Sequence, residues 1–264
     1  MSGFDKDWLA LREPADRAAR DPVLTGMLAG HLHDAEDPAI LDIGCGTGST
    51  WRSLVDHLPA DTRWLLLDHD PLLLEEAERR IGAADNVGYR PFDLTDLDAL
   101  PLEDISVITA SALFDLVSDE FCAAFVQRLA EHGCGLYAAL NYDGVVSWSY
   151  AHPLDGDMVA AFNRHQQTDK GFGPALGPGA TACLERHLGA SGYAVFTRPS
   201  PWRMDASSAA LQEAFLLGFH QPLVEMSGRS TDEIEDWLSF RIEAIGRPGS
   251  LCEVGHLDLI AFRG

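Results

Sequence analysis

The sequence predicts an α/β fold, in which a mostly parallel β-sheet carries helices on both faces. Short apolar runs alternate with amphipathic helical stretches along most of the 264 residues, which is the pattern of a parallel sheet covered by helices. A glycine-rich turn at 44–48 directly follows the first apolar run. We find no internal repeat and no low-complexity linker, so we expect a single domain over 1–264.

The elements of the first half follow in order from periodicity and cap residues. Residues 5–33 predict helices, the second of which begins at Pro22 after an Asp21 cap. Asp70 and Pro71 open another helix in the same way. Two further helices are expected at 47–58, with Trp51, Leu54, Val55 and Leu58 on one face, and at 119–132. The apolar runs predict five strands, at 39–43, 63–67, 87–91, 105–109 and 135–140.

The pattern changes after residue 140. Asp143-Gly144 is a strong hairpin signal, so we expect a turn at 141–144 and a returning strand at 145–150. A helix at about 154–166 and a Gly/Pro-rich loop at 170–179 come next. We interpret 143–180 as an insertion or lid. The expected parts are N-terminal helices (1–36), a cofactor-binding core (37–142), the insertion (143–190) and closing elements (191–264), with strands at 193–197 and 256–262 and helices at 206–224 and 231–246. The last strand suits an antiparallel edge strand.

Composition limits the partners. Nineteen basic residues against 41 acidic ones give a net charge of −22, which repels phosphate backbones and anionic membranes. We therefore expect a small-molecule substrate, no nucleic acid and no membrane. Acidity that only keeps the protein soluble is the simpler alternative. The five cysteines are scattered, no basic-apolar leader opens the chain, and no apolar stretch is long enough for a membrane span, so we expect a cytoplasmic protein, as a monomer or homodimer.

The glycine turn predicts a cofactor site. A chain that leaves a strand must turn sharply into a helix and let a ligand touch its backbone, and glycine permits both. The spacing is Gly-x-Gly-x-Gly at Gly44, Gly46 and Gly48, not the Gly-x-Gly-x-x-Gly of dinucleotide enzymes. Because S-adenosylmethionine (SAM) has no phosphate, a tighter turn suffices for it.

Three acidic residues support this interpretation. Asp42 lies in the first strand, and Asp68 ends the second strand about 20 residues after the turn, where a carboxylate can accept both ribose hydroxyls. Asp93 follows the third strand, where it can take an adenine amino group. Asp68 is the least ambiguous of the three, because an acidic residue at the end of an apolar strand at that separation has few structural duties. Asp42 can serve only as an acceptor for the loop, and Asp70 suits a helix cap better than a ligand.

These motifs resemble the class I SAM-dependent methyltransferase family over roughly residues 38–141. The matching stretches are Leu41-Asp42-Ile43-Gly44-Cys45-Gly46-Thr47-Gly48, Leu67-Asp68-His69-Asp70-Pro71 and Phe92-Asp93-Leu94. The resemblance implies a Rossmann-like seven-stranded sheet with an antiparallel last strand, SAM as cofactor and S-adenosylhomocysteine (SAH) as product. It further implies that Gly44 and Gly46 lie under the methionyl part, that Asp68 binds the ribose, that Asp93 and Leu94 bind the adenine, and that His69 flanks the ring. Cys45 in this loop suits a buried space-filling role.

The acceptor is expected beyond the carboxyl ends of the fourth and fifth strands, beside the cofactor. Ser111 would lie under the cofactor there, and Asp115 and Asn141 can point at an acceptor. Tyr142 offers a hydroxyl or a ring face, with Asp143 next to it. The alternatives are a helix cap for Asp115 and a plain hairpin turn for 142–144.

The expected lid concentrates polar side chains at a helix end, before glycines that would let it close. His165 is a candidate base, with Gln166, Asp169 and Lys170 as acceptor-binding candidates. A solvated helix end is the alternative. Near the N-terminus, Arg12 is a candidate partner for the cofactor carboxylate, or else it pairs with a neighbouring acid.

Together these features predict a SAM-dependent methyltransferase that acts on a nitrogen, oxygen or carboxyl group. A SAM-binding sensor or assembly partner without transfer activity would show the same cofactor motifs. A nicotinamide oxidoreductase is disfavoured by the glycine spacing and Asp93. We see no clustered ligand set, so we expect no metal.

Overall fold

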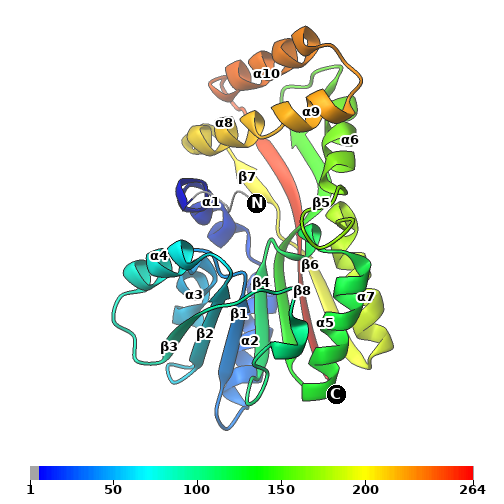
Figure 1. The fold of residues 1–264 in the computed structure, drawn as a ribbon. Helices are drawn as coiled ribbons and strands as arrows, with labels where there is room; N and C mark the ends of the chain where they lie inside the picture. The colour runs from blue at the N-terminus through cyan, green and yellow to red at the C-terminus, as the bar shows by residue number, and fades with distance from the viewer. Residues whose placement is uncertain (1–5, 264) are drawn as a thin grey trace.

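The computed structural model describes residues 6–263 and has a central eight-stranded sheet (Figure 1). Its order is β3-β2-β1-β4-β5-β8-β6, and the short β7 pairs with β8. The first five strands are parallel, while β8 runs antiparallel to β5, β6 and β7. The bounds are β1 Ala39–Ile43, β2 Arg63–Asp68, β3 Val87–Pro91, β4 Val107–Ser111, β5 Gly135–Trp148, β6 Tyr193–Pro199, β7 Trp202–Met204 and β8 Cys252–Arg263.

Helices cover both faces of the sheet, as predicted. On one face a core cluster joins the strands to α5 (Asp119–His132) and α7 (Ala180–Ala190). On the other face a cluster joins them to α2 (Pro22–His33), α3 (Ser49–Leu54) and α4 (Pro71–Ile81). The caps that set α2 and α4 are confirmed, since Asp21 and Asp70 each accept hydrogen bonds from the backbone N–H groups of the first turn.

A third cluster lies outside this sandwich. It joins the far half of β5, β7 and the first half of β8 to helices that stand beyond the carboxyl edge of the parallel strands (Figure 1). These helices are α6 Asp155–Gln166, α8 Ala209–Leu217, α9 His220–Met226 and α10 Thr231–Ile245. Helix α1 (Lys6–Ala19) packs against them through Trp8 and Leu11. We call α6, α8, α9 and α10 the cap helices.

The predicted hairpin at 141–144 is wrong. β5 continues through Asp143 and Gly144 to Trp148, because β8 supplies pairing partners along the whole length. The Asp-Gly pair forms an irregularity within the strand, where the register shifts between Tyr142 and Val146. Gly144 has a φ of 89°, and Asp143 Oδ1 accepts from the Val145 N–H. The local turn chemistry is therefore present, but it makes a bulge instead of a reversal.

Smaller expectations also need correction. β7 raises the strand count to eight, and β8 lies between β5 and β6 instead of at the edge. β4 begins at 107, and the helix predicted at 47–58 ends at Leu54 before a 3₁₀ turn at Val55–His57. The region 206–224 divides into α8 and α9. Of the expected helical stretch 5–33, residue 5 lies outside the described residues. Within 6–263, no helix is long and apolar enough to cross a bilayer.

Candidate functional site

The glycine turn joins β1 to α3 at the carboxyl edge of the sheet. Gly44, Gly46 and Gly48 all have positive φ, of 62°, 54° and 79°. A Cβ on Gly46 would lie 3.2 Å from the Leu9 side chain of α1, and one on Gly44 would lie 3.4 Å from Leu113. The backbone therefore has the left-handed turns that glycine permits, and the Leu9 and Leu113 side chains lie next to Gly46 and Gly44.

Asp68 ties the end of β2 to this turn. Its Oδ2 accepts from the Gly46 N–H at 2.8 Å, and its Oδ1 accepts from the Asp70 N–H at 3.0 Å. His69 is exposed, with Nδ1 3.5 Å from Asp68 Oδ1. The structure thus places the Asp68 carboxylate beside the glycine turn, and each of its oxygens keeps a further lone pair for a ligand.

Asp42 and Cys45 lie beneath the turn. Asp42 is fully buried, its Oδ1 accepts from Thr109 Oγ1 at 2.7 Å, and its Oδ2 has no partner among the described residues. Burial raises the pKa of Asp42 to about 7. Cys45 is buried too, and burial raises the pKa of its thiol. All five cysteines are free and buried.

Asp93 and Leu94 follow β3 and differ in exposure. Asp93 is exposed, and its Oδ1 accepts from the N–H and the hydroxyl of Thr95, which lowers its pKa. Leu94 is buried in the core cluster beside α5. Asp93 thus stands at the carboxyl edge with one oxygen engaged locally.

The arginines of α1 and the turn after it differ in what they already bind. Arg12 pairs with Asp16, at 2.8 and 3.2 Å, and lies over the Trp202 ring. The alternative prediction for Arg12, that it pairs with a neighbouring acidic residue, is therefore confirmed. Arg20 is buried and donates to Ser111 Oγ at 2.8 Å, while its Nε and Nη1 have no partner within 6–263. Ser111 also bonds to Thr50. Arg20 therefore has unused donors beside a predicted cofactor residue.

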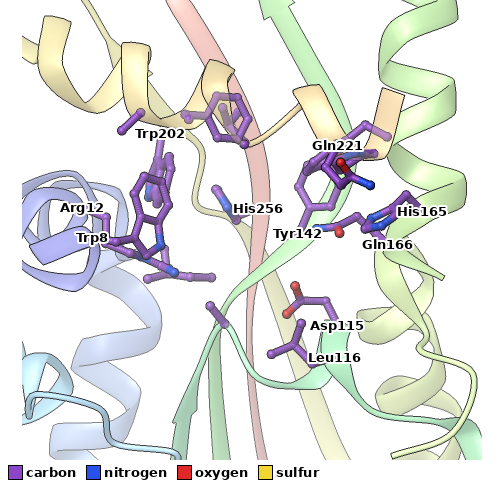
Figure 2. A pocket seen from close by; sticks show the side chains of 18 residues that line it. Trp8, Arg12, Asp115, Leu116, Tyr142, His165, Gln166, Trp202, Gln221 and His256 are labelled. Carbon is purple, nitrogen blue, oxygen red and sulfur yellow. The ribbon is translucent and has the colours of Figure 1, made fainter. Parts of the chain in front are cut away.

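A cavity of about 650 Å³ opens beyond the end of β4 and beside the middle of β5 (Figure 2). Trp8, Arg12 and Trp202 lie on one side, Tyr142, His165 and Gln221 on the other, and His256 between them. Its further lining comes from the segment after β4, from β5 and β8, and from the cap helices and their ends: Ala112, Asp115, Leu116, Leu140, Phe162, Gln166, Ala214, Phe215, Gly218, Pro222 and Val254.

The cavity and the glycine turn are adjacent. Leu113 lies against Gly44 and Leu9 against Gly46, while their sequence neighbours Ala112 and Trp8 line the cavity. Ala112 and Leu140 have positive φ, of 50° and 59°, without being glycine. Such backbone strain concentrates at functional sites. The residues that contact the glycine turn are thus the immediate sequence neighbours of residues that line the cavity.

Four of the predicted acceptor-side residues line this cavity: Asp115, Tyr142, His165 and Gln166. Asp115 lies in a 3₁₀ turn at Phe114–Leu116, and α5 takes Ser118 as its cap, so the cap alternative for Asp115 is wrong. Asp115 Oδ1 is buried without a partner in the described chain, and burial raises its pKa to about 6. The Tyr142 hydroxyl donates to Asn163 Oδ1 at 2.8 Å, and burial raises its pKa.

The other predicted acceptor residues do not line the cavity. Asn141 is fully buried, and its Nδ2 donates to the Ala138 and Leu257 carbonyls across the β5 irregularity. Asp143 bonds within its own bulge, and Asp169 accepts from the Gly171 and Gly173 N–H groups. Lys170 lies 3.5 Å from His165 Nδ1. Three of these side chains therefore bond to backbone groups instead of facing the cavity: Asn141, Asp143 and Asp169.

His165 has polar neighbours on both ring nitrogens. Its Nε2 lies 3.3 Å from Glu225 Oε2, and Lys170 Nζ approaches Nδ1. Burial and the Lys170 charge lower the pKa of His165, and burial lowers that of Lys170. At neutral pH the imidazole is therefore uncharged.

His256 and Trp202 are cavity residues that the sequence analysis missed. His256 is the direct register partner of Tyr142 on β8, and its ring packs against those of Trp202 and Tyr142. Burial and the Arg12 charge lower the pKa of His256 to about 3. Both residues come late in the chain. The pairing register between β5 and β8, which places His256 beside Tyr142, cannot be predicted from the spacing of residues in the sequence.

One group of ligand-type side chains lies elsewhere. Asp119, Cys183 and His187 place their ligand atoms within 4.8 Å of one another on α5 and α7. The Arg186 guanidinium reaches Asp119 Oδ2 at 2.5 Å and Cys183 Sγ at 3.6 Å. The positive charge next to these ligand atoms is therefore that of an arginine side chain. None of the three lines the cavity.

Residues 40–133 match the model of a family described as a methyltransferase domain. The fold is similar to that of the cyclopropane synthase MmaA2 from Mycobacterium tuberculosis, with a TM-score of 0.54 and 13% identity over 97% of this chain and 94% of that one. It is also similar to YcgJ from Bacillus subtilis, with a TM-score of 0.52 and 15% identity over 91% and 98%. The mycolic acid cyclopropane synthase CmaA1 matches with a TM-score of 0.51 and 16% identity over 91% and 82%. No curated protein sequence matches the chain.

The matched segment contains the glycine turn, Asp68 and Asp93, and it is similar to a methyltransferase domain. The fold as a whole is similar to those of the three solved structures.

Proposed function

We propose that this protein transfers the methyl group of SAM to a small or medium-sized molecule bound in the 650 Å³ cavity. The observation that carries the proposal is the position of the cavity. It lies beside the glycine turn, beyond the end of β4 and against the middle of β5, near the edge at which open α/β sheets bind their ligands. Its volume is in the range of small-molecule sites. The acceptor atom is a nitrogen, an oxygen or a carboxyl group.

In this proposal the cofactor lies along the carboxyl edge of β1, β2 and β3. The backbone of Gly44, Cys45, Gly46 and Gly48 passes under the methionyl part, and Asp42 orients the turn from below. Asp68 accepts the ribose hydroxyls, His69 flanks the ring, and Asp93 with the Leu94 backbone takes the adenine. The support is the positive φ of the three glycines, the Asp68 oxygens beside the turn, and the exposed Asp93.

Arg20 is the better partner for the methionyl carboxylate than Arg12. Arg12 already makes two hydrogen bonds to Asp16, whereas Nε and Nη1 of the buried Arg20 have no partner among the described residues. A buried guanidinium with unused donors is costly unless a ligand satisfies it. Ser111 and Thr50 hold it next to the β4 end.

Methyl transfer depends more on the alignment of the acceptor with the methyl group than on reactive side chains of the protein. The acceptor attacks the methyl carbon in line with the bond to sulfur, and the cofactor supplies the reactive methyl group. The cavity would hold the acceptor in that line and exclude water. A proton on the attacking atom has two nearby candidate bases: Asp115, whose pKa burial raises to about 6, and His165, whose pKa burial lowers.

We further propose that the protein works in the cytoplasm, as a monomer or homodimer, without nucleic-acid or membrane partners. The support is the net charge of −22 and the five buried thiols.

The test has two stages. SAH is titrated into the protein by calorimetry, with NADH as the control ligand; SAH should bind and NADH should not. Methyl-labelled SAM is then incubated with the protein and a pool of small metabolites, and label should pass to an extractable small molecule with stoichiometric SAH. Binding of NADH in place of SAH would overturn the cofactor assignment. SAH binding without any label transfer would instead favour a SAM-binding sensor or assembly partner.

A further inference from the structure

The cavity is bounded by a closed circuit of rings. Trp202 contacts Phe215 at 6.3 Å between centroids, Phe215 contacts Phe162 at 6.4 Å, and Phe162 contacts Tyr142 at 6.0 Å. Tyr142 then contacts His256 at 6.2 Å, and His256 returns to Trp202 at 5.0 Å. Trp8 adds a sixth ring, 6.4 Å from Trp202. We call these six residues the ring circuit. Adjacent rings hold one another in place, so the circuit is preorganised.

One acidic group of the cavity has an oxygen that lacks a hydrogen-bond partner among the described residues. Arg12 keeps its charge, but its guanidinium is already engaged by Asp16 through two hydrogen bonds. His256 and His165 have lowered pKa values and are neutral at pH 7. Asp115 remains. Its Oδ1 is buried and has no partner in the part of the chain that the structure describes. Among the described lining residues, Asp115 therefore carries the one charge that a ligand would have to satisfy.

We propose that the methyl acceptor is an amine on an apolar or aromatic body, whose ammonium form binds between Asp115 and the ring circuit. This inference rests on the proposed function. A buried carboxylate oxygen without a partner matches an N⁺–H donor, and such charge-assisted hydrogen bonds are the strong ones. Ring faces attract cations. Because Arg12 already lies over Trp202, the other rings of the circuit are the ones that an ammonium group would meet. The apolar remainder of the lining, including Leu116, Leu140 and Val254, suits a carbon body.

The same features disfavour the other acceptor classes. A carboxylate or phenolate acceptor would place a second negative charge next to Asp115 in a low-dielectric cavity, which costs free energy. A neutral alcohol can bond to Asp115 but gains nothing from the ring faces as a cation does. Arg12 is no counter-ion for an anionic acceptor, since Asp16 and the Trp202 ring already engage it.

The group-transfer step balances with residues that line the cavity. The bound ammonium passes a proton to Asp115 and becomes a neutral amine. Its lone pair forms the new N–C bond while the methyl C–S bond breaks, and that electron pair stays on sulfur to give SAH. The product is a methylammonium ion, and Asp115 releases its proton to water. Substrate ammonium and SAM thus give methylated ammonium, SAH and one proton.

The test compares matched ligands on the SAH-loaded protein. Three triplets are titrated by calorimetry and thermal shift, each an amine, an alcohol and a carboxylic acid on the same body: phenethyl, naphthylmethyl and indolylethyl. In at least one triplet the amine should bind at least roughly tenfold more tightly than both analogues. The same amine should accept label from methyl-labelled SAM.

Two variants separate the site from the fold. Asp115→Asn keeps the shape of the side chain and removes its charge, so the amine preference should disappear while SAH affinity stays unchanged. Glu120→Gln, an exposed position on α5, should leave both unchanged. Equal or tighter binding of every acid or alcohol, or an amine preference that survives Asp115→Asn, would overturn the inference. If SAH itself does not bind, the proposed function fails instead.

Discussion

The Glu13 carboxylate of α1 accepts two hydrogen bonds from the Arg52 guanidinium of α3, at 2.7 and 2.8 Å. Arg80 of α4 reaches the same carboxylate at 2.7 Å, and Arg52 also donates to the Thr47 carbonyl in the glycine turn. These contacts fasten the first helix over the turn. The Arg52 and Arg80 charges stabilise the ionised carboxylate, and the pKa of Glu13 is lowered although burial opposes this.

Glu13→Gln should therefore loosen α1. The charge-assisted bonds to a nearly buried group are lost, and the free energy of unfolding should fall by about 1–3 kcal/mol. Chemical denaturation at pH 7 measures this. Glu76→Gln removes an exposed ion pair with Arg79 and should leave stability nearly unchanged. Equal losses in the two variants would contradict the role of Glu13.

Gly46→Ala should weaken SAH binding and stability together. The left-handed backbone costs a residue with a side chain about 1–2 kcal/mol, and the new Cβ would also press on Leu9. The double variant Leu9→Ala with Gly46→Ala relieves only the contact. It should recover part of the stability and leave the rest of the loss in place. Full recovery in the double variant would show that φ strain is unimportant at this position.

Asp68→Asn and Asp70→Ala should separate ligand binding from helix capping. Asp68 is proposed to accept the ribose hydroxyls, so Asp68→Asn should weaken SAH binding roughly 10–100-fold. Asp70 caps α4, so Asp70→Ala should cost about 1 kcal/mol of stability and leave SAH affinity unchanged. Calorimetric titration and thermal melts measure the two effects. A loss of SAH affinity in Asp70→Ala alone would reverse the assignment.

Arg20→Gln should weaken SAH binding roughly tenfold, whereas Arg12→Gln should leave it nearly unchanged. The discriminating ligand is 5′-methylthioadenosine, which lacks the amino acid part of SAH. Its affinity should be the same in the wild type and in Arg20→Gln, because the guanidinium is proposed to meet only the carboxylate. A parallel loss for both ligands would instead mean that Arg20 supports the fold of the site.

Stability in the absence of cofactor should depend on pH through Asp42. Its pKa is raised from 3.8 to about 7, so the folded state holds the proton more tightly than the unfolded state. The ionised form is penalised by burial. Its cost is absent below pH 4, grows as the pH rises towards 7, and is complete above that. Asp42→Asn should therefore gain about 2–4 kcal/mol relative to the wild type between pH 4.5 and pH 8. A constant difference over that range would show that Asp42 is not buried as an ionisable group.

The cofactor half of the molecule could be predicted from sequence because its signals are local. Asp21 and Asp70 mark helix starts, and the first strand, the glycine turn and Asp68 lie in a fixed order whose spacing is set by one β-α-β unit. The bounds of β1 and α5 agree with the prediction residue for residue. Local chemistry is sufficient when the backbone conformation depends on the residues next to it.

The acceptor half could not be predicted in the same way because its geometry depends on distant pairing. The sequence Asp143-Gly144 predicts a hairpin turn. In the structure β8 pairs with β5 on both sides of these residues, so they form a bulge. Asn141 was expected at the acceptor, but it donates to the Ala138 and Leu257 carbonyls at a second irregularity of β5, where the register shifts between Ala138 and Asn141. His256 enters the cavity through its register with Tyr142, more than 100 residues earlier in the chain. The long antiparallel pairing of β5 with β8 thus determines which polar side chains face the cavity.

The continuity of β5 and β8 has a consequence for how this protein can evolve. Both strands pass from the core sandwich into the cluster of the cap helices, so the two halves share a rigid spine. The side chains proposed for the methyl donor come mostly from before residue 112, whereas much of the ring circuit, including Phe162, Trp202, Phe215 and His256, comes from after residue 150. Substitutions in the later segment can reshape the acceptor chamber and leave the donor geometry intact. Under the proposed function, substrate range can therefore change among descendants of this chain without disturbing the residues proposed to hold the cofactor.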